Sequence, residues 1–117
     1  DRELQWLNAL VHPLAQRRIQ QLAAGQTSAV FCCGVPLLFE TGWERTMTRT
    51  VAVWCDPQTQ WRRLLERGWS EADIRARLRQ QMSMDEKLAR ADYGLINTGS
   101  LEMLRQQCRS LYDVFTS

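Results

Sequence analysis

Apolar residues recur at two different spacings along the chain, and each spacing predicts a different kind of element. Between residues 1 and 24 they recur at roughly helical intervals, so a helix is expected there. The dipeptide His12-Pro13 interrupts this run and should kink the helix or split it in two. Residues 28–35 and 51–55 are instead nearly continuous apolar runs, which is typical of strands covered on both faces in a parallel sheet.

The second half of the chain alternates helical and strand-like segments. Helices are expected over residues 57–67, 70 to about 80, 84–91 and 100 to about 115, with a short strand over residues 92–96. Asp56, Ser70 and Ser100 stand where three of these helices need an N-capping residue. This alternation predicts an α/β fold, in which helices flank a parallel sheet.

The composition fits one ordinary globular domain and limits the classes of partner that we expect. The 117 residues are 44% apolar and 24% charged, with a formal net charge of +2. No apolar run approaches the length of a membrane span, and no signal-peptide pattern is present, so we expect no membrane partner and a cytoplasmic location. The small net charge, with arginines concentrated on one segment, disfavours a nucleic-acid partner.

Cysteines and basic residues bear on the chemistry. The cysteines, Cys32, Cys33, Cys55 and Cys108, lie in apolar segments at spacings that match no zinc pattern, which predicts reduced core residues and no metal site. Lys87 is the only lysine, and every other basic side chain except the single histidine is an arginine. The planar guanidinium group grips phosphate oxygens in pairs, so this bias weakly favours a phosphate-containing ligand.

Five stretches carry a family resemblance in order along the chain. They are "LNALVHPL" (7–14), "VPLLFE" (35–40), Q-x-x-R-x-x-x-R (60–67), R-x-x-x-Q (77–81) and "EKLARADYGLINTGSLEML" (86–104). Together they resemble the C-terminal two-thirds of dephospho-coenzyme A kinase, and they cover essentially the whole chain. The resemblance implies a P-loop kinase-type fold like that of the nucleoside monophosphate kinases, with a helical lid.

The resemblance also implies a division of the chain. Residues 1–27 would be part of the helical region that binds coenzyme A, residues 28–66 and 92–117 would form the α/β sheet region, and residues 67–91 would form the lid. The sequence departs from the family pattern at Gly34, where many members have aspartate, and at a shortened lid entrance, Arg67-Gly68-Trp69.

The largest departure is the phosphate-binding loop. The chain contains no G-x-x-x-x-G-K-[ST] motif and lacks the early aspartate expected to accept the proton of the attacking hydroxyl group. We therefore expect this chain to be an inactive fragment. We also expect it to need its missing N-terminal segment, or another chain, to complete the sheet.

The implied reaction is ATP-dependent phosphorylation of the ribose 3′-hydroxyl group of dephospho-CoA, with Mg²⁺ bound alongside ATP. On this resemblance Arg63 and Arg67 contact the ATP phosphates, and Arg77 is a third candidate. Such a reaction needs positioning and positive charge more than covalent chemistry. The alternative for these arginines is a solvated helix face with surface ion pairs, for example between Arg63 and Glu66.

The acceptor would be held by the segment that follows the first predicted strand. Pro36 and Leu37 would form the floor of its site. Glu40 would hydrogen-bond the substrate or anchor the helical part that holds it, whereas the alternative is a carboxylate that caps the next helix. His12, the only histidine, would line the same site, and the alternative is a packed residue at a helix terminus.

Asn97 and Gly99 follow the last predicted strand, where this class of kinase usually holds adenine through backbone contacts. The alternative is a plain turn between a strand and a helix, for which both residue types are expected. Two other functions stay open: a different small-molecule P-loop kinase, and a non-catalytic binding module derived from the fold.

Overall fold

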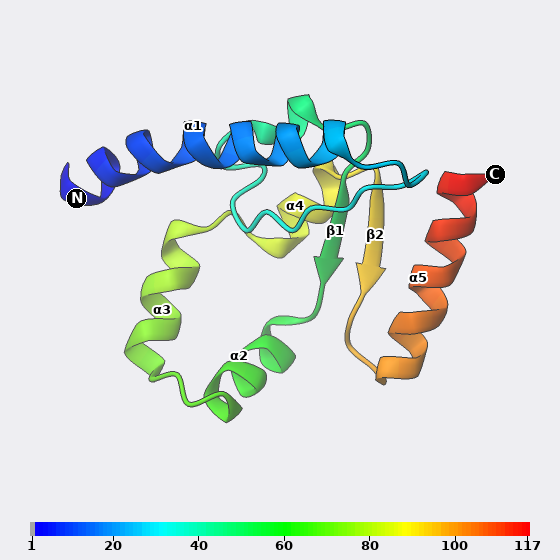
Figure 1. Ribbon diagram of the computed structural model, residues 1–117. Coiled ribbons are helices and arrows are strands. Elements are labelled where there is room, and N and C mark those ends of the chain that lie inside the picture. Colours follow the sequence, from blue (N-terminus) through cyan, green and yellow to red (C-terminus); the bar gives the residue numbers. More distant parts are fainter. Residues whose placement is uncertain (1) are drawn as a thin grey trace. The chain divides into compact units, whose positions relative to one another are not determined.

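The computed structural model describes residues 2–117 and divides them into two compact units, residues 2–34 and residues 35–115 (Figure 1). The first unit contains helix α1 (Arg2–Gly25), which confirms the predicted helix. The predicted split at His12-Pro13 is wrong, because α1 continues through Pro13. A proline removes one N–H hydrogen bond, and the turns on either side keep their own.

Residues 28–35, a predicted strand, are not paired as a strand in the described part of the chain. An extended segment becomes a strand only when a neighbour satisfies its N–H and C=O groups, and neither described strand pairs with this one. The prediction of buried cysteines is also wrong for Cys32 and Cys33, which are exposed, and for Cys108. Cys55 is half-buried, and all four thiols are free.

The second unit is built around a two-stranded parallel sheet. Strand β1 (Val51–Trp54) pairs with strand β2 (Tyr93–Ile96), which confirms both predicted strands within one residue at an end. Thr50 and Asp92 brace the start of this pair. The Asp92 carboxylate accepts hydrogen bonds from the Thr50 N–H (2.8 Å) and hydroxyl group (3.1 Å), and Thr50 Oγ1 accepts one from the Asp92 N–H (3.0 Å). These bonds set the register of the two strands.

Helices connect and flank the strands. They are α2 (Pro57–Glu66), α3 (Glu71–Gln80), α4 (Met84–Arg90) and α5 (Leu101–Thr116), and a 3-10 helix, η1 (Trp43–Thr46), precedes β1. The predicted N-caps are confirmed: Asp56, Ser70 and Ser100 each accept a hydrogen bond from the N–H three residues later, and Ser83 caps α4 in the same way. The α/β fold with a parallel sheet and flanking helices is therefore confirmed.

Among residues 2–117, no helix is both long and apolar enough to span a membrane.

Helix α4 packs directly on the sheet, as Figure 1 shows. Its first turn is attached to β1 by a hydrogen bond of 2.7 Å from Trp54 Nε1 to Asp85 Oδ1. Its other end approaches β2 so closely that a Cβ atom at Gly94 would overlap the Leu88 side chain. Gly94 is therefore required by the close approach of helix and strand.

Replacing Gly94 with valine should lower the free energy of unfolding of the full-length protein by about 1–3 kcal/mol, because the new side chain overfills this contact. Urea unfolding midpoints measure the effect. Introducing Gly94→Val into a Leu88→Ala background supplies the control, since removing the Leu88 side chain makes room. Valine should then cost less, and an equal cost in both backgrounds would contradict the proposed overlap.

Candidate functional site

Helix α2 carries the candidate phosphate-binding residue Arg63, ends just before a second one, Arg67, and starts at a well-formed cap. Asp56 accepts hydrogen bonds from the Thr59 hydroxyl group (2.7 Å) and from the Thr59 N–H (2.9 Å). These two bonds hold the pKa of the Asp56 carboxyl group below its ordinary value of 3.8. The folded state therefore gains stability from the ionised cap above that pH, and loses it as the pH falls through the lowered pKa.

Arg63 joins α2 to the loop that follows β2. Its Nη1 atom donates a hydrogen bond of 2.6 Å to the main-chain oxygen of Asn97, and the residue is half-buried. The surface ion pair that we considered between Arg63 and Glu66 is not formed, because Glu66 lies 4.0 Å from Arg62 instead. A guanidinium group has five N–H donors, so Arg63 keeps donors for a ligand while it holds Asn97.

Arg67 lies in the tight turn that ends α2. Gly68 adopts a φ of +90°, and the N–H groups of Gly68 and Trp69 bond to the carbonyl groups of Leu65 (2.9 Å) and Leu64 (3.2 Å). The backbone of the turn is thus fixed. The Arg67 side chain is exposed, and within residues 2–117 its guanidinium group has no hydrogen bond or ion pair. The guanidinium group, attached to this fixed backbone, is available to an anionic ligand.

Arg77 lies on α3, close to the same turn. Its guanidinium carbon is 5.2 Å from the centre of the Trp69 ring, and Arg75 is placed similarly, 5.5 Å from the Trp61 ring. Such cation–π contacts hold the cations against α2 and the turn. Ile74, which immediately precedes Arg75, is fully buried and anchors α3 by its apolar side.

Asn97 and Gly99 lie together in the loop between β2 and α5. The Asn97 N–H donates to the Trp54 main-chain oxygen at 2.7 Å, so the loop leaves the sheet in a fixed direction. A Cβ atom at Gly99 would lie 2.8 Å from Met103 Sδ, so another residue there would require the Met103 side chain to move. The structure thus brings Arg63 and Asn97 together.

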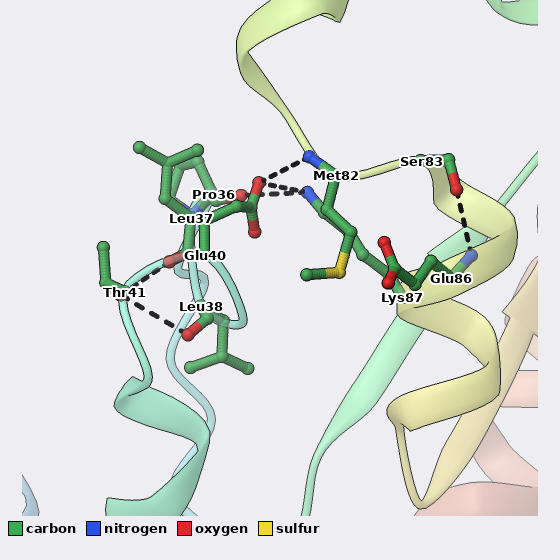
Figure 2. A network of polar contacts seen from close by, with 9 residues as sticks. All are labelled: Pro36, Leu37, Leu38, Glu40, Thr41, Met82, Ser83, Glu86 and Lys87. Carbon is green, nitrogen blue, oxygen red and sulfur yellow. Dashed lines mark hydrogen bonds and ion pairs between the residues drawn. The ribbon is translucent and has the colours of Figure 1, made fainter.

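The predicted acceptor residues Pro36, Leu37 and Glu40 share one turn, which Figure 2 shows. Glu40 Oε2 lies 3.1 Å from the ammonium nitrogen of Lys87 and accepts a hydrogen bond of 3.3 Å from the Met82 N–H. The alternative in which Glu40 caps the next helix is wrong, because the N-cap of η1 is Gly42 and no side chain caps that helix. Pro36 is exposed, and Leu37 is half-buried.

The remaining predicted site residue, His12, is half-buried on α1 in the first unit. It is therefore described apart from the site residues of the second unit. Sequence reasoning also missed a residue: Lys87, on α4, binds Glu40 and was not assigned to the site. Lys87 is the only lysine in the chain, and this was the signal that could have pointed to it.

The described residues offer no group of side chains that could serve as metal ligands. Across residues 2–117, no three or more histidine, cysteine, aspartate or glutamate side chains gather in a way that could hold a metal ion. The described residues therefore do not fit a dedicated metal centre. Among the candidate phosphate-binding arginines, Arg67 is unpaired within residues 2–117, whereas Arg63 and Arg77 have protein partners. The candidate acceptor turn contains a half-buried ion pair.

Comparisons with known proteins show the family of this chain. The family model for dephospho-CoA kinase matches residues 1–103. The dephospho-CoA kinase of Symbiobacterium thermophilum is 40% identical over 111 residues, which are 91% of this chain and 46% of that protein. The dephospho-CoA kinase of Leptospira interrogans serovar copenhageni is 38% identical over 115 residues, 95% of this chain and 55% of that protein.

A solved structure is also similar. The crystal structure of TT1252 from Thermus thermophilus has a TM-score of 0.84 and is 35% identical, and the match covers 100% of this chain and 62% of that one. The chain spans about half the length of the curated relatives that it matches. Because the family model covers most of its residues, the chain belongs to the dephospho-CoA kinase family.

Proposed function

We propose that the full-length protein to which this chain contributes transfers the terminal phosphoryl group of ATP to the ribose 3′-hydroxyl group of dephospho-CoA. Family membership supports this reaction. The observation that carries the proposal for this chain is the arrangement on α2, where Arg63 holds the Asn97 loop and Arg67 presents an unpaired cation one turn later. One helix thus connects a candidate base-binding loop with a candidate phosphate-binding group.

In this proposal the arginines supply positive charge around the transferring group. Phosphoryl transfer spreads negative charge over the phosphate oxygens, and preorganised cations stabilise that charge without moving. Arg67 and Arg63 contact the phosphates, and Arg77 approaches them from α3. Closure of α3 over the nucleotide would exclude water, which otherwise competes with the acceptor hydroxyl group.

The two substrates would occupy different parts of the chain. Asn97 and Gly99 would contact adenine through their backbone, while Pro36 and Leu37 would contact dephospho-CoA and Glu40 would hold their turn. His12, in the first unit, is proposed separately as a residue that contacts dephospho-CoA. Mg²⁺ would arrive with the ATP phosphates, a common mode of binding for this ion, and no step is assigned to it because the described residues form no donor set for it.

Three further expectations stay predictions. We propose that residues 28–35 become a strand when further residues of the full-length protein, or another chain, complete the sheet. The division into a CoA-binding region, a sheet region and a lid (residues 1–27, 28–66 with 92–117, and 67–91) is likewise a proposal. A cytoplasmic location and the lack of a nucleic-acid partner are expected from the sequence.

A coupled ADP-release assay with ATP, Mg²⁺ and dephospho-CoA tests the function. It is run on this chain and on a version extended upstream, with a panel of nucleosides as competing acceptors. ADP release that requires dephospho-CoA, in the extended version only, is the expected result. Release with another acceptor would favour a different small-molecule kinase. A folded extended protein that is silent with every acceptor would favour a binding module.

A further inference from the structure

One half-buried ion pair connects two segments that are far apart in the sequence. Lys87, on α4, and Glu40, in the turn after residue 35, lie 3.1 Å apart, with only 19% and 16% of their side chains exposed (Figure 2). The other ion pairs of the described residues have both side chains at least 50% exposed. Because a charge buried without its partner is costly, this pair is far more position-specific than an exposed one.

Lys87 holds the turn at a second point. Its ammonium group also donates a hydrogen bond of 3.3 Å to the main-chain oxygen of Pro36. The turn has its own internal bonds, since the Thr41 hydroxyl group and N–H both donate to the Leu37 oxygen, at 2.6 and 3.2 Å. The turn is therefore ordered by its own hydrogen bonds, and Lys87 contacts it near both ends, at Pro36 and at Glu40.

Glu40 holds a third segment through the same oxygen atom. Its Oε2 accepts a hydrogen bond of 3.3 Å from the N–H of Met82, in the loop between α3 and α4 (Figure 2). The other carboxylate oxygen, Oε1, is buried and has no partner among the described residues. Both protein contacts of the Glu40 carboxylate, to Lys87 and to Met82, therefore pass through Oε2.

The element that carries Lys87 is itself fixed. Asp85, two residues earlier on α4, accepts the hydrogen bond from Trp54 of β1, and Leu88 lies against Gly94 of β2. The ammonium group therefore has a set position relative to the sheet. Because Lys87 contacts Glu40 and Pro36, it also fixes the position of the turn that contains them.

We propose that Glu40 and Lys87 form a latch, called here the 40–87 latch. It sets the position of the 36–41 turn against α4 and the sheet. Through the bond from Met82 to Glu40, it also connects the turn to the end of α3. Both are positioning residues. This inference rests on the proposed function for the identity of the substrate. In that function, the turn held by the latch presents Pro36 and Leu37 to the acceptor. The latch thereby couples acceptor binding to the segment that leaves the lid.

Amide hydrogen exchange on the full-length protein tests the latch without any substrate. In Lys87→Met, exchange at residues 36–43 and at Met82 should both accelerate by at least about tenfold, because one change frees both segments. Lys87→Arg keeps the charge and a donor, and should restore most of the protection. Arg90→Met is the matched control, because it removes an exposed cation from the same helix, paired only with Glu86. Acceleration in one segment alone, or equal acceleration in Arg90→Met, would overturn the latch.

If Lys87→Met does not fold, Glu40→Gln replaces it. Glutamine keeps an oxygen for the Met82 N–H but loses the charge, so exchange should accelerate mainly at residues 36–43. Unchanged exchange in both segments would overturn the latch by this route too.

Kinetics separate the latch from the proposed function. In Lys87→Met the KM for dephospho-CoA should rise by about tenfold, since the acceptor turn loses its position, while the KM for ATP should stay within about twofold. Equal effects on both substrates would contradict a role at the acceptor turn. If the unmodified protein fails to phosphorylate dephospho-CoA, the proposed function falls, and the exchange experiment still decides whether the latch exists.

Discussion

Replacing Arg67 with alanine lowers kcat of the full-length protein, assayed with ATP and dephospho-CoA, by about 10²–10³-fold, which is the effect expected for one preorganised group that stabilises transition-state charge. The structure gives the reason. The Arg67 guanidinium group has no partner within residues 2–117, so the protein does not use it for its own packing. Its backbone is held by the Gly68 turn, which fixes the point from which the side chain reaches toward a ligand.

Replacing Arg67 with alanine should affect the stability of the protein far less than its turnover. The Arg67 side chain is exposed, and truncating such a side chain should change the free energy of unfolding by no more than about 0.5 kcal/mol. Measurements of kcat and of the urea unfolding midpoint on the same sample check both parts. Arg62→Ala is the matched control, because Arg62 is an exposed arginine of the same helix with only a 4.0 Å contact to Glu66. A similar loss of kcat in Arg62→Ala would show that overall positive charge, and not the position of Arg67, matters.

Replacing Arg63 with methionine should raise the KM for ATP by about 10–100-fold, from the loss of a charge-assisted hydrogen bond. Methionine keeps the apolar stem and removes the donor to Asn97, so the loop after β2 loses its link to α2. If this loop holds adenine, the preference for ATP over GTP should also fall. Steady-state kinetics with both nucleotides, in the full-length protein, give the two values.

The two roles of Arg63 predict different patterns. A contact with phosphate alone would lower kcat equally for ATP and GTP and leave the preference unchanged, which would contradict the role at the Asn97 loop. Arg63→Lys tests the geometry, because lysine keeps the charge but lacks the planar fork. Arg62→Met serves as the control for losing a cation from this helix.

Local features were predictable because their causes lie within a few residues. The caps at Asp56, Ser70 and Ser100 each bond to an N–H three residues away, so the sequence around each one contains the whole interaction. The strands after Thr50 and Asp92 followed from their apolar runs for a similar reason. The strand expected at residues 28–35 failed, because a strand also needs a neighbour to pair with, and that is a tertiary condition.

The candidate site was predictable in part. The family pattern singled out Arg63, Arg67 and Glu40, but it gave no partner for any of them. Glu66 was a reasonable partner for Arg63 by spacing along the helix, yet the structure pairs Glu66 with Arg62 and turns Arg63 toward Asn97. Spacing identifies the side chains within reach, and packing of the helix on its neighbours decides which of them meet.

The sequence by itself therefore determined the order of helices and strands from residue 51 on, the N-caps of α2, α3 and α5, and the family. The tertiary structure alone decided which charges are satisfied: Arg63 by an oxygen 34 residues away, and Lys87 by Glu40 and by an oxygen 51 residues away. Helix and strand patterns arise from near neighbours in the chain, whereas these contacts depend on how α2 and α4 lie against the sheet. Arg67 is left free by that same packing, and its freedom is what a phosphate-binding role requires.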